Sequence, residues 1–174
     1  YEEYKAGRAK IDDALILQLE KAKEVFTAFG IPIYSKPGFE ADDVIGTITH
    51  ELKNKKDVEI IIASGDMDTM QLVDGKRVQV YTLRKGLTDT VIYDEKKVEA
   101  RFGFGPKLLI DYKGLRGDPS DNIIGVKGIG EKTATSLITT FGTIQNMYKV
   151  LKKKGDEYKK TGINERVKNL LLES

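Results

Sequence analysis

Three short acidic clusters are the features of this sequence that could carry chemistry. Carboxylate oxygens are the ligands that Mg²⁺ and Mn²⁺ prefer in proteins. The chain has no cysteine and a single histidine, so a thiolate site and a zinc site built from several imidazoles are both excluded. Any metal bound here must therefore be held by oxygen atoms. The clusters are Glu40-Ala41-Asp42-Asp43, Asp66-Met67-Asp68 and Asp118-Pro119-Ser120-Asp121.

Each cluster also has a purely structural explanation, and a single cluster is better explained that way. Acids in the first turn of a helix are stabilised by about 0.3–1 kcal/mol each. Asp66 could cap a helix, and Asp118 and Asp121 could be turn residues. Such structural roles require neither a ligand nor a catalytic function.

The combination of clusters favours a metal site. The first two clusters each follow a predicted strand and open a predicted helix, which places both at the carboxyl edge of a sheet. Unpaired carboxylates a few ångströms apart repel by roughly 4 kcal/mol per pair at an effective dielectric constant near 20. Such crowding predicts compensating cations. Two divalent ions about 4 Å apart would supply them and would suit hydrolysis of a phosphodiester.

A glycine-rich hairpin follows the third acidic cluster and precedes a predicted helix. Its glycines allow another chain to approach the backbone closely, and the exposed N–H groups at the helix start favour an anion. This layout is typical of a helix-hairpin-helix that holds a DNA backbone without reading its sequence, although a plain tight turn remains the alternative. A nucleotide-binding P-loop is excluded because Glu131 directly follows the second glycine. The residues predicted to contact DNA are Gly125, Lys127, Gly128, Gly130, Lys132 and Thr133.

Charge is distributed unevenly along the chain. The net charge is +2, but residues 122–174 contain ten Lys and Arg against five acids, which leaves −3 for residues 1–121. This asymmetry fits a metal site beside a phosphate-binding surface. A solvated lysine-rich face explains it equally well. No apolar stretch is long enough to span a membrane, so we expect a cytoplasmic protein.

The hydrophobic pattern predicts an α/β fold with a mostly parallel sheet flanked by helices, followed by a helical subdomain. Strands are expected over residues 31–34, 58–63, 78–83 and 91–93, and the second of these should be covered on both faces. Helices are expected over residues 12–29, 40–53, 68–73 and 94–102. Beyond residue 103 only helices are expected, over residues 106–115, 131–141, 144–152 and 163–172, with a polar loop over 156–162.

Several motifs in the same order give the sequence a family resemblance. The chain resembles the 5′ nuclease domain of bacterial DNA polymerase I, within the flap endonuclease superfamily, over nearly its whole length. On this basis residues 1–103 would form the C-terminal portion of an α/β nuclease domain whose first strand is absent, and residues 104–174 a helix-hairpin-helix subdomain. The motifs are Tyr4-Lys5-Ala6-Gly7-Arg8, Phe39 to Val44, Ser64 to Leu72, Gly117 to Asn122 and Gly128 to Ala134.

The resemblance implies an activity and assigns roles to residues. It implies a structure-specific 5′-3′ exonuclease or flap endonuclease that acts on DNA and RNA-primed ends in replication and repair, through two Mg²⁺ or Mn²⁺ ions. Lys5 and Arg8 would contact the phosphate near the scissile bond, and a K⁺ ion could sit at the hairpin. Glu40, Asp42 and Asp43 would serve the first metal, Asp66 and Asp68 would lie between the metals, and Asp118 and Asp121 would serve the second.

The implied partners are branched, nicked or 5′-flap DNA, and a polymerase domain that follows in the parent chain. Two other readings stay open, namely a non-catalytic DNA-binding module whose acids only cap helices, and an RNA-cleaving domain of the PIN type. The sequence also departs from the family pattern. The family's domain begins with a strand that carries a metal-binding aspartate, and a second such aspartate precedes Lys5, but neither is present. We therefore expect the chain alone to be poorly stable or inactive.

Overall fold

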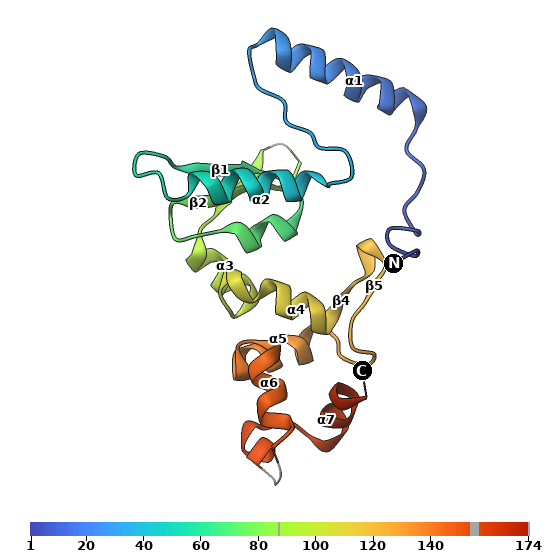
Figure 1. Cartoon of the computed structure of the whole chain (residues 1–174), viewed down its shortest axis with the longest axis vertical. Helices are drawn as coiled ribbons and strands as arrows, with labels where there is room; N and C mark the ends of the chain where they lie inside the picture. Colours follow the sequence, from blue (N-terminus) through green and yellow to red (C-terminus); the bar gives the residue numbers. More distant parts are fainter. Residues whose placement is uncertain (87, 154–156, 174) are drawn as a thin grey trace.

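A small α/β layer and a helical lobe make up most of the computed structural model, which describes residues 1–86, 88–153 and 157–173 (Figure 1). The sheet contains β1 (Ile60–Ala63), β2 (Val78–Lys85) and β3 (Asp89–Tyr93) in that order. β1 pairs in parallel with β2, and β2 pairs antiparallel with β3. The α/β prediction is confirmed, and the described sheet has one parallel and one antiparallel pair.

The helices of this layer begin where acidic residues cap them. At the start of α2 (Ala41–Leu52) the backbone N–H of Glu40 donates to Oδ2 of Asp43 at 2.9 Å. Asp94 caps α3 (Glu95–Phe102) by accepting from the N–H of Lys97. The helix predicted after Asp66 is a 3₁₀ helix, η1 (Met67–Leu72). Local capping therefore places the first two acidic clusters at the starts of α2 and η1.

The chain beyond residue 103 is mostly helical, as predicted, but the expectation of helices alone is wrong, because Gly117–Asp118 and Ile123–Ile124 pair antiparallel as the short strands β4 and β5. Its well-packed core includes Leu115, Ile138, Met147 and Leu171, all at most 2% exposed. The polar loop expected over residues 156–162 instead contains a 3₁₀ helix, η4, while residue 156 lies outside the described residues. The elements are η2 (Pro106–Leu108), α4 (Leu109–Arg116), β4 (Gly117–Asp118), η3 (Pro119–Asp121), β5 (Ile123–Ile124), α5 (Glu131–Phe141), α6 (Ile144–Leu151), η4 (Glu157–Thr161) and α7 (Glu165–Leu172).

Helix α1 (Asp13–Ala28) stands apart from the rest of the molecule (Figure 1). The helix was predicted, but none of its residues is buried, and Phe26 is 47% exposed. The whole chain exposes 12622 Å², whereas a compact monomer of this size exposes about 8500 Å². Within the described ranges, no helix is both long and apolar enough to cross a membrane.

Two strand predictions are wrong in this structure. Residues 31–34 form no strand, because in the described part of the chain no partner strand pairs with them, and Tyr34 is 67% exposed. β1 was expected to be covered on both faces, but only Ile62 is buried, and Ile61 is 57% exposed. A strand forms only where a second strand supplies hydrogen bonds, and it is covered only where another element packs on it.

Candidate functional site

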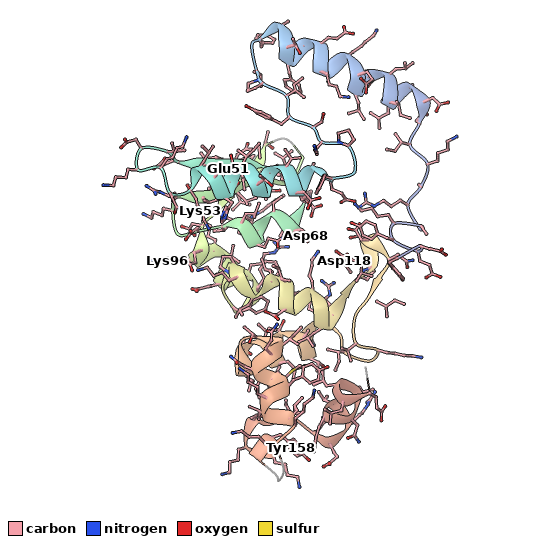
Figure 2. All side chains as sticks on the ribbon, in the orientation of Figure 1. Glu51, Lys53, Asp68, Lys96, Asp118 and Tyr158 are labelled. Carbon is pink, nitrogen blue, oxygen red and sulfur yellow. The ribbon has the colours of Figure 1, made fainter. Side chains whose placement is uncertain are left out.

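Six of the seven predicted acidic side chains line one cavity of about 680 Å³. They come from three elements that are distant in sequence, namely the start of α2, η1 and the β4–η3 turn. Two of the residues that line it, Asp68 on η1 and Asp118 at the end of β4, are labelled in Figure 2. Asp66 does not line the cavity. The six that do are Glu40, Asp42, Asp43, Asp68, Asp118 and Asp121.

Several of these acids also have the structural roles that were the alternative explanation. Asp66 accepts a hydrogen bond from the N–H of Asp68 at 2.9 Å and so caps η1. Asp43 belongs to the capping box of α2. Asp118 accepts from the N–H of Ser120 at 3.0 Å and from its hydroxyl at 2.6 Å. Capping and the shared cavity therefore occur together at Asp43 and Asp118, whereas Asp66 caps η1 without lining the cavity.

Lys113 lies between two of the acidic elements and was not identified from the sequence. Its ammonium group is 2.6 Å from Oδ2 of Asp118 and also contacts Oδ1 of Asp68. The side chain extends from α4, five residues before Asp118. One signal was available in the sequence, namely a lysine one turn before an acidic cluster on a helix with apolar neighbours.

Two further basic residues pair with the remaining clusters. Lys5 forms an ion pair with Glu40, and Arg8 forms one with Asp121. Both had been placed beside the scissile phosphate by the family resemblance, and the structure brings both to the acidic cavity. Backbone contacts hold this segment in place, since the N–H of Lys5 donates to the carbonyl of Asp121 at 3.0 Å and the Asn122 amide donates to the carbonyl of Glu3 at 2.8 Å.

The ion pairs correct one step of the sequence argument. Crowded carboxylates were expected to require divalent ions, but the three cations Lys5, Arg8 and Lys113 already form ion pairs with four of them. Over residues 1–86, 88–153 and 157–173, no group of three or more His, Asp or Glu side chains is arranged to hold one metal ion. Charge crowding alone therefore does not establish a metal site here.

Electrostatics differ from one carboxylate to another. Burial alone would raise the pKa of Asp118, but hydrogen bonds from Lys113 and Ser120 outweigh it and lower the pKa to about 2. The pKa of Asp42 is raised, first by burial and then by the negative charges of Asp66 and Asp68. Burial opposes the charge of Lys113, yet its hydrogen bonds to Asp118 and Asp68 raise its pKa overall. Asp42 therefore retains a net negative environment, and within the described part of the chain it takes part in no ion pair.

The glycine hairpin has one buried end and one open end. A Cβ atom on Gly125 would lie 2.2 Å from the backbone nitrogen of Gly117, so the two segments touch through their main chains. Gly128 has a φ of 88°, which a side chain rarely adopts. By contrast, a Cβ atom on Gly130 would meet nothing within 4 Å. Lys127 and Lys132 are both exposed beside this open end.

Comparison with known proteins agrees with the geometry. Residues 1–103 match the family described as the 5′-3′ exonuclease N-terminal resolvase-like domain, and residues 104–173 match the 5′-3′ exonuclease C-terminal SAM fold. This chain belongs to the 5′-3′ exonuclease family. The resemblance inferred from the sequence motifs is thereby confirmed.

The relatives of this chain include DNA polymerases and a separate 5′-3′ exonuclease. DNA polymerase I of Caldicellulosiruptor bescii is 43% identical over 155 residues, which cover 88% of this chain and 18% of the polymerase. The 5′-3′ exonuclease of Buchnera aphidicola subsp. Baizongia pistaciae is 41% identical over 150 residues, which cover 86% of this chain and 48% of that protein. The chain thus spans less than half of these two relatives.

A solved structure shares the fold. The flap endonuclease of bacteriophage T5, in a pseudo-enzyme-product complex with DNA and metal ions, has a TM-score of 0.70 and 26% identity. The match covers 98% of this chain and 64% of that one. The α/β layer and the helical lobe of this chain therefore both have counterparts in a flap endonuclease.

Proposed function

We propose that this chain forms the larger part of a structure-specific 5′-3′ nuclease site that hydrolyses phosphodiester bonds near a 5′ end in branched or nicked DNA, including RNA-primed ends. The observation that carries this proposal is the convergence of six carboxylates from α2, η1 and the β4–η3 turn on one cavity. Membership of the 5′-3′ exonuclease family and likeness to a flap endonuclease that binds DNA support it.

The donor set fits two hard divalent cations, Mg²⁺ or Mn²⁺. All candidate ligands are carboxylates, and Oδ1 of Asp68 is buried without a hydrogen bond of regular geometry, with only the ammonium of Lys113 against it. When bound, such ions supply Lewis-acid stabilisation of the phosphate and a more acidic water molecule. Glu40, Asp42 and Asp43 would hold one ion, Asp118 and Asp121 the other, and Asp66 and Asp68 would lie between them.

The chain's own basic and glycine-rich elements would position the substrate. Lys5 and Arg8 lie at the rim of the cavity and would bind the phosphate beside the scissile bond once released from their carboxylate partners. The hairpin from Gly125 to Gly130, with Lys127 and Lys132, would hold the duplex backbone without reading its sequence. A K⁺ ion could be bound by carbonyl oxygens of this hairpin, and a polymerase domain would follow in the parent chain.

The test replaces Asp68 by Ala in the full-length protein that carries this chain. We expect 5′-flap cleavage with Mg²⁺ to fall about a hundredfold or more, because a carboxylate proposed to lie between the metals is lost. Binding to the same flap in EDTA should change only a few-fold. Asp57→Ala, which removes an exposed acid outside the cavity, is the matched control.

One alternative function has an observation in its favour. The capping bonds and ion pairs already satisfy most of the acids, as a non-catalytic DNA-binding module would require. That module predicts the same cleavage activity, or the same absence of cleavage, for the Asp68→Ala variant and the unmodified protein. A PIN-type ribonuclease is less well supported, because a helical lobe with a glycine hairpin follows the sheet in this chain.

A further inference from the structure

A second cavity lies beside the acidic one and has a different character. It encloses about 640 Å³ between η1, the end of α3 and the exposed face of α4. We name it the α4 groove. It is lined by basic, aromatic and aliphatic side chains, chiefly Arg101, Phe102, Ile110, Tyr112, Lys113 and Arg116.

The α4 groove connects the two parts of the proposed site. Asp68, Gln71 and Lys113 line both the groove and the acidic cavity, so the groove opens where the carboxylates end. At its other end it reaches Glu131, the first residue of α5, which directly follows the glycine hairpin. Residues on one face of α4, spaced three and four apart, form the wall between these ends.

The arginines of the groove are held in place by neighbouring rings. Nη1 of Arg101 donates to the hydroxyl of Tyr93 at 2.9 Å, and its guanidinium lies 5.5 Å from the centre of the Phe102 ring. The guanidinium of Arg116 lies 5.9 Å from the centre of the Tyr112 ring. A guanidinium that is already oriented loses less conformational freedom when it binds an anion. Each group keeps further N–H donors for such a ligand.

Charge in the groove favours an anion. It contains three cations and two acids, and the carboxylate of Asp68 already contacts Lys113. The other acid, Glu131, is 3.9 Å from Arg116 with 70% of its side chain exposed, which makes a weak pair. Ile110, 65% exposed, adds an apolar contact at the same wall. Phosphate with an adjoining sugar or base matches this combination of guanidinium, aromatic and aliphatic groups.

From these contacts we propose that the α4 groove binds the phosphodiester backbone of one DNA strand on its way from the acidic cavity to the hairpin. Arg101 and Arg116 are the phosphate ligands, and Ile110 contacts the sugar. The inference rests on the proposed nuclease function and deepens it, because it gives the site a third DNA contact besides the hairpin and the Lys5–Arg8 segment. Lys113 marks the end of the groove nearest the cleaved bond.

The first test measures binding of a 5′-flap DNA in EDTA at several salt concentrations, with the full-length protein. We expect Arg101→Ala and Arg116→Ala each to weaken binding about fivefold to tenfold, and to reduce the slope of log affinity against log salt by roughly one. Arg84→Ala, at the exposed end of β2, is the charge-matched control and should change neither quantity. Unchanged salt slopes in both groove variants would overturn the inference.

The second test locates the contact on the DNA. Neutral methylphosphonate linkages are placed one at a time between the cleaved bond and the segment of duplex held by the hairpin. At one position, the neutral linkage should weaken binding to the unmodified protein but should not weaken binding to the Arg116→Ala variant any further. If the linkage and the substitution weaken binding additively at every position, the inference is contradicted. Displacement of the DNA by a free 5′-mononucleotide in an Arg116-dependent way would also contradict it, because the groove would then bind a released product.

The failure of this inference can be told apart from failure of the proposed function. If the unmodified protein binds and cleaves flap DNA while both arginine variants behave like Arg84→Ala, only the groove assignment is wrong. If cleavage is absent, or is unaffected by Asp68→Ala, the nuclease proposal itself fails.

Discussion

The ammonium nitrogen of Lys113 lies 2.6 Å from Oδ2 of Asp118 while also contacting Asp68 on η1. This side chain therefore connects α4 to the carboxyl edge of the sheet at the point where the acidic cavity meets the α4 groove. It occupies the position between two predicted ligands where a bound cation would compete with it. We therefore expect this lysine to stabilise the metal-free arrangement and to oppose metal binding.

Replacing Lys113 by Ala should tighten metal binding. An incoming Mn²⁺ ion would no longer have to displace an ammonium group from Asp68 and Asp118, so we expect its affinity to rise roughly tenfold. Isothermal titration with Mn²⁺ measures this directly. Lys107→Ala, an exposed lysine on η2, is the control. Weaker Mn²⁺ binding in the Lys113 variant would mean that the lysine organises the carboxylates for the metal instead.

Acid should destabilise the metal-free protein partly through Asp118. Its pKa is lowered to about 2 in the fold from an ordinary value of 3.8, so its contribution is complete above about pH 4 and is lost as the pH falls through about 2. The shift corresponds to about 2 kcal/mol of unfolding free energy. Urea titrations in EDTA should show Asp118→Asn less stable at pH 6, with a flatter dependence between pH 4 and 2. If the unfolding free energy of Asp118→Asn depends on pH between 4 and 2 just as that of the control Asp57→Asn does, Asp118 does not have this role.

Features set by neighbours in sequence could be predicted, and features set by distant packing could not. A helix begins after Asp94, within the range expected, and the glycine hairpin precedes α5 as expected, because both depend on a few adjacent residues. Lys113 was missed because one of its two partners, Asp68, is brought to it only by the packing of α4 against η1. The apolar face of α1 follows from helical periodicity, but periodicity does not reveal whether another element covers that face.

Gly125 and Gly130 should respond differently to alanine. A Cβ atom on Gly125 would clash with the backbone of Gly117 and Leu115, so Gly125→Ala should lower the unfolding free energy by about 3 kcal/mol or more. Gly130 has a φ of −94° and open space around it, so Gly130→Ala should stay within about 1 kcal/mol. Thermal unfolding followed by circular dichroism compares the two. Equal losses would argue that both glycines serve the same role.

The two hairpin lysines should contribute to DNA binding through phosphate contacts. Lys127→Ala and Lys132→Ala should each weaken binding to flap DNA and reduce the slope of log affinity against log salt by about one unit. The measurement is a salt series in EDTA by fluorescence anisotropy. Lys96→Ala on α3, labelled in Figure 2, removes the same charge from an exposed site away from the hairpin. If the salt slopes of the two hairpin variants match that of the Lys96→Ala control, the hairpin is only a structural turn.

Replacing apolar side chains of α1 by alanine should lower the free energy of unfolding of this 174-residue chain far less than the same replacement in the helical lobe. Leu19 and Phe26 are 51% and 47% exposed, so Leu19→Ala and Phe26→Ala remove little buried surface, and each should cost less than about 0.5 kcal/mol. Leu115 is 1% exposed, and Leu115→Ala should cost about 3 kcal/mol because it leaves a cavity. Urea unfolding of the three variants measures the difference. Losses above about 2 kcal/mol at Leu19 or Phe26 would show that α1 packs against a further surface in solution.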